Sequence, residues 1–173
     1  MCGHREDPEE DRKERTVRQS TCADSHKYLW APVSEWPPIV LKWDISKESQ
    51  RFSKDGLSPE EFNKWYPQGL CLGYVALPEF DMRLCFFSRR KDRELWKIGD
   101  PYKLAHLIGY LAEGRPISPP LATPMTSQEI VIDGGHHRYA IAKAIGESEV
   151  PVYVTPRHKS DLASLLRVQW IPS

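Results

Sequence analysis

The chain has 173 residues, of which 28% are charged, and its 24 basic and 24 acidic side chains give a formal net charge of zero. This length suits one domain with a sizeable core, and the balanced charge excludes a global attraction to nucleic acid or anionic membranes. No apolar run approaches the roughly 18 residues that span a bilayer, and the first residues lack the apolar core of a secretory signal. We therefore expect a soluble, cytoplasmic protein without a membrane partner.

The N-terminal half divides into a tail and an extension. Residues 1–27 are a mixed-charge tract with almost no sizeable aliphatic side chain, which predicts a disordered tail. Residues 28–82 are interpreted as an N-terminal α/β extension. In it, the β-branched and aromatic content of residues 39–45 predicts a strand, and Ser58 with Glu61 three positions later predicts the start of a short helix.

The middle of the chain contains two apolar runs and one well-marked helix. The runs at residues 70–77 and 82–87 are separated by a proline-containing turn, and their length favours strands. Asp100 followed by Pro101 marks a helix over residues 101–113, because aspartate caps helices and proline fits their first position.

The last third alternates strand, helix and strand. Residues 130–132 and 150–154 have the composition of short buried strands, and residues 138–145 between them form an alanine-rich, helix-prone segment. A final amphipathic helix is expected after Ser160 as its cap. These elements predict an α+β fold with a mixed sheet and flanking helices.

The junction between the strand at residues 130–132 and the helix after it carries the clearest chemical signal. Two successive glycines permit backbone torsions that other residues avoid, and they let an anion approach the exposed N–H groups. A helix N-terminus favours phosphate, an arginine adds a bidentate donor, and histidines exchange protons near neutral pH. The pattern predicts a phosphate-binding turn formed by Gly134, Gly135, His136, His137 and Arg138.

The helix at residues 101–113 offers further ligands. If it packs beside the same sheet as the second helix, Lys103 and His106 reach the same pocket, and Lys103 serves as a phosphate clamp. Three other interpretations stay open. The glycine pair can be a plain tight turn, the charged residues 89–93 can be a solvated loop or a contact for nucleotide or nucleic acid, and a zinc or manganese site is conceivable from imidazole and carboxylate ligands. Its ligands would be His106, His136, His137 and Asp133.

Residues 130–154 resemble the signature stretch of the ParB/sulfiredoxin superfamily. Sulfiredoxins carry Gly-Gly-Cys-His-Arg-Tyr-Ala, which residues 134–140 match except that His136 stands at the cysteine position. The Asp-Pro-x-Lys helix start of that family is matched by residues 100–103, and its Pro-Pro strand start by residues 119–120. The likeness covers about residues 83–168 and implies a nucleotide-binding domain over residues 83–173.

The departures from that family limit the activities that the resemblance implies. Without a thiolate at His136, sulfinic-acid reduction has no nucleophile, so we reject sulfiredoxin activity. The serine and threonine contacts of the family are replaced by His106 and Tyr110. Its stand-alone members include plasmid-encoded fertility-inhibition proteins, with NTPase and DNA-cleaving activities, and kinases of small metabolites.

The resemblance implies, first, a metal-dependent NTPase that binds ATP or CTP with Mg²⁺ and also engages or cleaves DNA. His136 would transfer protons, Mg²⁺ would bind near Asp133 or Glu94, and the phosphate ligands would be Gly134, Gly135, His137, Arg138, Lys103 and His106. A second possibility is a kinase of a small hydroxyl substrate with Glu94 or Asp92 as base. A third is a non-catalytic nucleotide-sensing inhibitor whose tryptophan-rich residues 28–82 bind a protein partner.

Overall fold

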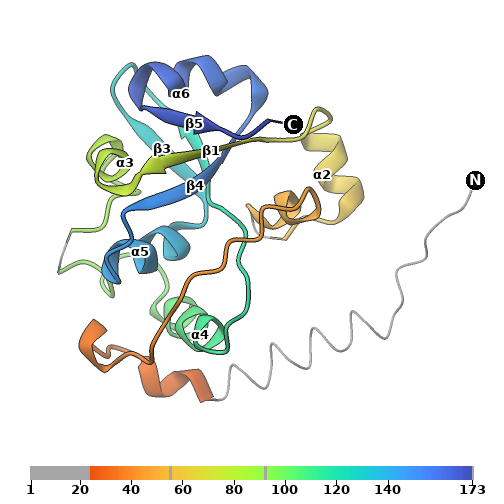
Figure 1. Ribbon diagram of the computed structural model, residues 1–173. Helices are drawn as coiled ribbons and strands as arrows, with labels where there is room; N and C mark the ends of the chain where they lie inside the picture. The colour runs from red at the N-terminus through yellow and green to blue at the C-terminus, as the bar shows by residue number, and fades with distance from the viewer. Residues whose placement is uncertain (1–23, 55, 92, 173) are drawn as a thin grey trace, which may run out of the picture.

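The computed structural model describes residues 24–54, 56–91 and 93–172, so the predicted tail lies almost wholly outside the described residues. The fold is α+β, as predicted: a mixed five-stranded sheet with helices around it (Figure 1). The strand order is β3-β2-β4-β1-β5, in which β2 pairs parallel with β4 and the other pairs are antiparallel. The strands are β1 (Cys71–Ala76), β2 (Leu121–Pro124), β3 (Ile130–Gly134), β4 (Glu149–Val154) and β5 (Val168–Trp170).

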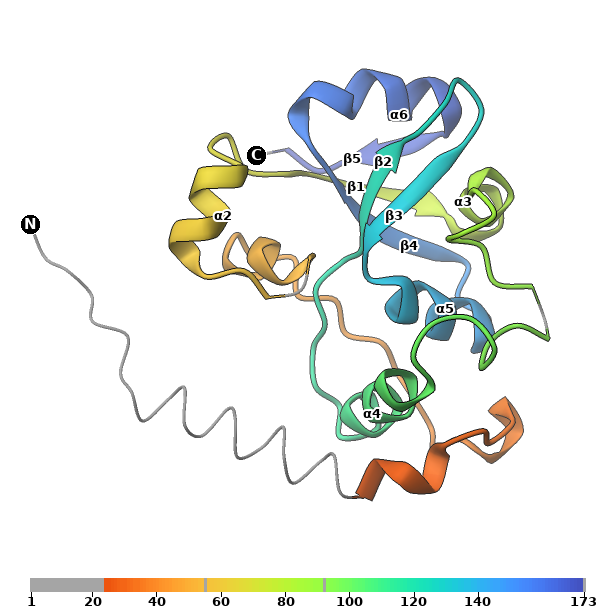
Figure 2. The same ribbon diagram turned by 180° about the vertical axis from the view of Figure 1, so that it is seen from behind.

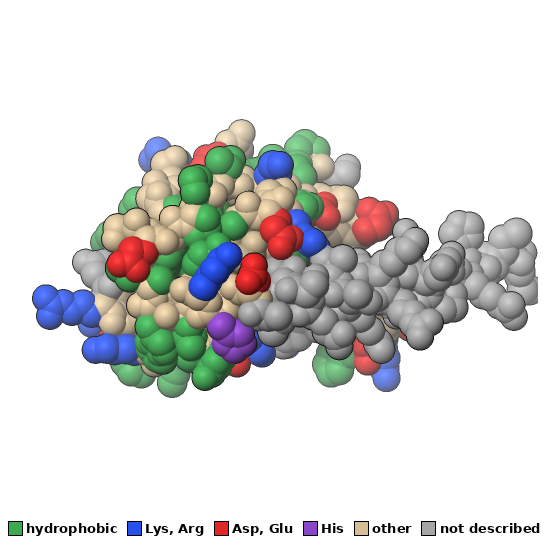
Figure 3. Space-filling model, turned by 90° about the horizontal axis from the view of Figure 1, so that it is seen from below, with side chains coloured by type: hydrophobic (Ala, Val, Ile, Leu, Met, Phe, Trp, Pro, Cys, Tyr) green, Lys and Arg blue, Asp and Glu red, His purple; other side chains and the backbone are tan. Residues whose placement is uncertain are grey.

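Helices cover both faces of this sheet. Figures 1 and 2 show α6 on one face and α5 on the other, with α4 beyond α5. No helix in the described part of the chain is long and apolar enough to cross a membrane. Seen from below, on the side of α4, acidic, basic and hydrophobic side chains are interspersed (Figure 3). The helices are α2 (Pro59–Trp65), α3 (Leu77–Arg83), α4 (Pro101–Ala112), α5 (His136–Ala144) and α6 (Lys159–Leu165).

Two predicted helix starts are confirmed by their side-chain caps. At α2, the Ser58 hydroxyl accepts from the Glu61 N–H at 3.2 Å, and the Glu61 carboxylate accepts from the Ser58 N–H at 3.1 Å. At α4, the Asp100 carboxylate accepts from the N–H of Tyr102 at 2.9 Å and of Lys103 at 3.4 Å. The predicted cap at Ser160 is wrong, because α6 begins at Lys159 and Ser160 lies inside its first turn.

The strand predicted at residues 82–87 is also wrong. This part of the chain begins with helix α3, and beyond it only Leu84 forms an isolated bridge, to Ile130. Pro78 lies at the helix start, where proline is favoured, and the helix buries Leu77 and Phe80 on one face in the main core. Met82 and Arg83 complete this helix, so the start of the predicted strand and the turn predicted before it are helical.

The strand predicted at residues 39–45 is likewise wrong. Only Trp43 makes a bridge there, in parallel with Ile117. Leu41 and Trp43 pack against the core, whereas Val40 and Ile45 are exposed. The segment is thus anchored by alternate side chains without a continuous ladder to a neighbouring strand.

One sheet joins the predicted extension to the predicted nucleotide-binding domain. Strand β1 comes from residues 28–82, yet it lies between β4 and β5, with Cys71 opposite Val154 and Ala76 opposite Glu149. The main core correspondingly mixes side chains of β1 and α3 with those of β3, β4, α5 and α6. The boundary suggested at residue 82 therefore runs through a continuous layer of structure.

The glycine turn is held in very close contact with the N-terminal half of the chain. A Cβ on Gly134 would lie 2.1 Å from the carbonyl oxygen of Ser53 and 2.9 Å from the Cα of Lys54. Gly135 adopts a left-handed conformation with φ of 92°, and a Cβ there would lie 2.8 Å from Pro120. The glycines therefore serve first to let two backbone segments approach each other.

We expect Gly134→Ala to lower the free energy of unfolding by about 3 kcal/mol, at the upper end of overpacking costs, because backbone cannot move aside as a side chain does. Gly146→Ala is the comparison: its φ is 82° and a Cβ there meets open space, so only the torsional cost of about 1 kcal/mol applies. Urea denaturation of both variants measures the difference. A Gly134→Ala protein as stable as the parent would show that the contact with Ser53 is wrong.

Candidate anion-binding site

The predicted strand, turn and helix are present at the glycine junction. Strand β3 ends at Gly134 and α5 begins at His136, with Gly135 as the N-cap. Glycine has no side chain with which to cap the first turn, so the positive end of this nine-residue helix is not neutralised by its own cap residue.

Arg138 has a structural role that the sequence did not predict. Its Nη1 donates to the carbonyl oxygens of Ser118 at 2.5 Å and Pro119 at 3.2 Å, and its Nη2 donates to that of Ser53 at 3.0 Å. One guanidinium thus ties α5 to the segment before β2 and to the N-terminal half. These bonds engage donors that the sequence assigns to phosphate.

His136 is anchored by a buried serine. Its Nε2 lies 3.5 Å from the Ser88 hydroxyl, and Ser88 is fully buried. The same hydroxyl accepts from the Ile132 N–H at 2.9 Å and faces the Cys85 thiol at 3.7 Å. The His136 imidazole is therefore oriented toward β3 by a hydrogen-bonded partner.

His137 is held neutral by its surroundings. Burial, followed by the positive charges of Arg90, His136 and Lys103, lowers its pKa from 6.5 to about 4, while Asp100 acts in the opposite direction. The expectation that both histidines exchange protons near neutral pH is thus wrong for His137, because desolvation disfavours its charged form. At pH 7 this ring is a neutral donor and acceptor among cations.

Arg90 is the most unusual residue of this region. It is only 5% exposed, and burial lowers its pKa. Its Nη1 donates to the carbonyl oxygens of Phe87 and Ser88, both at 3.1 Å, but its Nε has no hydrogen-bond partner in the part of the chain that the structure describes. Among those residues no carboxylate lies within 4.0 Å of its guanidinium. Burying a cation costs several kcal/mol, and the charge of Glu94 offsets only part of this cost.

Gly99 brings Arg90 and His137 together. It has a φ of 84°, and a Cβ at this position would lie 3.0 Å from Cε1 of His137 and 3.6 Å from Nη2 of Arg90. Lys103 is exposed in the first turn of α4, close enough for its charge to act on His137. A positively charged site therefore forms where three segments come together. They are the loop before α4, the start of α4 and the start of α5.

Sequence reasoning missed part of this arrangement. The sequence does not single out Gly99, and it places Arg90 in a charged run that suits either a solvated loop or a ligand contact. The position of Gly99 could have indicated its role. A glycine directly before the Asp100-Pro101 helix start allows other segments to pack closely there. No sequence pattern distinguishes the buried Arg90 from the half-buried Arg89 or from the exposed Lys91 and Arg93.

The remaining predicted residues are Glu94, His106 and Asp92. Glu94 is half-buried; its carboxylate accepts from the Lys91 N–H at 2.9 Å, and its charge acts on Arg90. His106 is half-buried one turn further along α4. Asp92, the other predicted base, lies outside the described residues.

The alternative zinc or manganese site is not assembled. Among the residues that the structure describes, no three His, Cys, Asp or Glu side chains are grouped to hold a metal ion. Asp133 is exposed on β3 and accepts a hydrogen bond from the Thr123 hydroxyl of β2, whereas His136 faces Ser88. The proposed ligands thus point to different neighbours.

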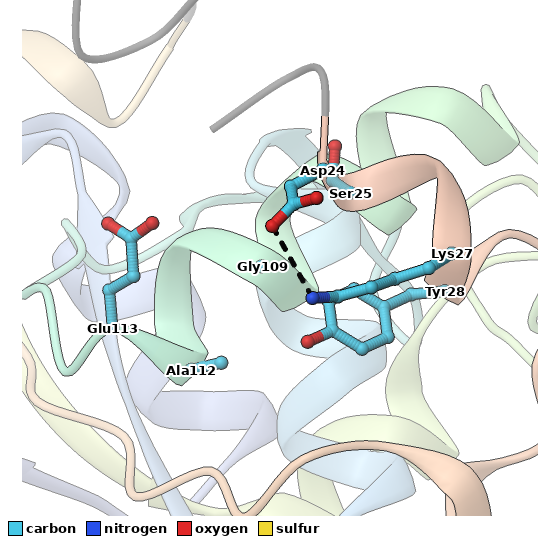
Figure 4. A pocket seen from close by; sticks show the side chains of 7 residues that line it. All are labelled: Asp24, Ser25, Lys27, Tyr28, Gly109, Ala112 and Glu113. Atoms are coloured by element: carbon cyan, nitrogen blue, oxygen red, sulfur yellow. Dashed lines mark ion pairs between the residues drawn. The ribbon is translucent and has the colours of Figure 1, made fainter. Parts of the chain in front are cut away.

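A separate hollow lies near the other end of α4. It has a volume of about 290 Å³, and the residues that line it are Asp24, Ser25, Lys27, Tyr28, Gly109, Ala112 and Glu113 (Figure 4). Lys27 and Asp24, both on its N-terminal wall, form an ion pair of 3.6 Å. Because this hollow faces the negative end of α4, it does not suit an anion.

Comparisons of this chain with known protein families, with curated proteins and with solved structures found no match. The assignment of the site therefore depends on its own residues and geometry.

We expect an NMR titration to place the pKa of the His137 imidazole at about 4. Since the unfolded chain binds this proton near pH 6.5 and the folded protein only near pH 4, the folded state loses stability as the pH falls between these values. His137→Gln should flatten this part of the profile of unfolding free energy against pH. A pKa of 6.5 or higher for the free protein would contradict the buried, cationic environment.

Proposed function

We propose that this protein binds the phosphates of a nucleoside triphosphate where the loop before α4 meets the N-terminus of α5. The observation that carries the proposal is Arg90, a buried guanidinium whose Nε has no partner in the described chain. An anion is the ligand that offsets the cost of burying such a charge.

Several further features favour phosphate. The charges of Arg90 and Lys103 converge on His137, which is neutral and able to donate a hydrogen bond. The start of α5 adds the positive end of a helix. Asp100 is the opposing charge, and its carboxylate is engaged by two N–H groups of α4. A polyanion with many acceptor oxygens matches these donors better than a single carboxylate does.

The nucleotide itself is proposed from the resemblance to the ParB/sulfiredoxin superfamily. Residues 100–103 and 134–140 match phosphate-binding motifs of that family, and the structure brings Lys103 close to His137. His136 is the group we assign to proton transfer during hydrolysis, because Ser88 orients its ring beside the helix start. ATP and CTP are the expected ligands.

The residues present do not fit a Mg²⁺ site built by the protein. Asp133 is exposed and bonded to Thr123, and the described residues contain no cluster of metal ligands. Any Mg²⁺ would be held mainly by phosphate oxygens, as is common for this ion. We assign no step of the reaction to it.

Calorimetric titration with ATP, CTP and GTP tests the proposal. Arg90→Met keeps much of the side-chain volume but removes the charge, and it should weaken binding by about tenfold to a hundredfold. Lys103→Ala, at an exposed position, should weaken binding by up to about tenfold. Lys64→Ala, an exposed lysine of α2, is the matched control and should bind like the parent.

Two checks make this outcome decisive. Thermal unfolding must show that Arg90→Met is folded at the titration temperature, and Arg90→Lys should recover part of the affinity. Parental affinity in both Arg90→Met and Lys103→Ala would refute the site. Arg138→Ala is less informative, because it also removes bonds to Ser53, Ser118 and Pro119.

A further inference from the structure

Two adjacent phenylalanines stand on the surface beside the proposed phosphate site. Phe86 is 82% exposed and Phe87 is 70% exposed, and their rings meet edge to face with centroids 5.5 Å apart. Met82, at the end of α3, is 74% exposed. Burying an aromatic ring stabilises a folded protein, and two neighbouring exposed rings lose this stabilisation. Such an exposed pair indicates a surface that binds a partner.

This surface is basic although the chain as a whole is neutral. Residues 82–97 contain six lysines and arginines and two acidic residues. Arg83, Lys91 and Arg93 are exposed, and Asp92 lies outside the described residues. Glu94 is half-buried and accepts from a backbone N–H. Six basic against two acidic side chains give this stretch a positive net charge.

The nearest buried carboxylate is already neutralised. Asp81 accepts hydrogen bonds from the Tyr139 hydroxyl and from Lys143 at 2.8 Å, and it pairs with Arg89 at 3.2 Å. These interactions, together with a bond from Lys143 to the Arg90 carbonyl, join α3 and α5 to the base of the loop. The phenylalanines thus project from a fixed base.

The loop borders the proposed phosphate site and lies far from α2. Arg90 donates to the carbonyl oxygen of Phe87 at 3.1 Å, so the aromatic pair and the buried guanidinium share one turn. Figures 1 and 2 both place α3 and α2 on opposite sides of the molecule.

We propose that this loop binds single-stranded nucleic acid. Bases stack on Phe86 and Phe87, and the strand's phosphates contact Arg83, Lys91 and Arg93. Stacking on exposed aromatic rings, combined with nearby cations, is how proteins hold single strands without reading their sequence. Bases in a duplex are stacked on each other and do not reach these rings, and the loop presents neither a helix nor a strand pair to a groove.

Fluorescence anisotropy with labelled 20-nucleotide strands and the corresponding duplex tests this inference. The single strand should bind at low salt, and the duplex at least about tenfold more weakly because it offers no stacking. The double variant Phe86→Ala/Phe87→Ala should weaken single-strand binding by at least about tenfold. Trp65→Ala removes a ring that is 70% exposed on α2 and should have no effect. Arg93→Ala should reduce the slope of log affinity against log salt by about 0.7.

The inference does not depend on the nucleotide site, and ATP titration of the same double variant separates the two. Retained ATP affinity with lost strand binding is the expected result. Equal binding of duplex and single strand, or unchanged strand binding by the double variant, would overturn the inference. Binding to vesicles of phosphatidylcholine and phosphatidylserine in the absence of any strand binding would overturn it as well, and would assign the loop to a membrane surface.

Discussion

The contact between Gly134 and the carbonyl of Ser53 is the constraint on which the arrangement of this protein depends. Only a residue without a side chain allows the end of β3 to lie against this backbone, and Arg138 secures the contact by donating to the same carbonyl. Together they fix where α5 begins and how the N-terminal half meets the sheet. The residues at the start of α5, including His136 and His137, take their positions from this junction.

The same constraint changes the role of the glycine motif. From sequence, the glycine pair offers its backbone to an anion and Arg138 adds the charge. In the structure, Gly134 lies against the backbone of Ser53 and not against a free space for an anion. Arg138 donates hydrogen bonds to three backbone carbonyl oxygens. The guanidinium nitrogen that lacks a hydrogen-bond partner in the described chain belongs to Arg90 instead, in the loop before α4.

Burial gives the site its electrostatic character. Desolvation lowers the pKa of both Arg90 and His137, and Arg90 lowers that of His137 further. A bound anion would reverse part of each effect, because it favours the charged form of both groups. Phosphate binding and the protonation of His137 are therefore expected to be coupled.

Local signals allowed much of the fold to be predicted. The capping residues Ser58 and Asp100 mark helix starts through bonds within one turn, so sequence alone identifies them. The α+β class also follows from the alternation of strands and helices after residue 100. Residues 78–81 are predicted as a turn between two strands because they contain proline and acidic residues, but they form most of α3, and burial of Phe80 by distant residues stabilises the helix.

The site was less predictable than the fold because its decisive features are tertiary. Lys103 and His137 are 34 positions apart in the sequence. The sequence predicts that they are close only if the two helices that carry them pack beside the same sheet. The burial of Arg90, and the engagement of Arg138 by Ser53, depend on packing between segments that no spacing rule connects. Composition likewise hides the basic loop, since acidic residues elsewhere cancel its charge.

The Nε–H signal of Arg90 in a ¹H–¹⁵N correlation spectrum, recorded with and without ATP, tests the central claim most directly. Assignment by comparison with Arg90→Lys identifies the signal. We predict that saturating ATP shifts this resonance downfield and slows its exchange with water, whereas adenosine leaves it unchanged. An unchanged Arg90 signal at ATP concentrations that saturate binding would contradict the account, because the phosphates would then bind elsewhere.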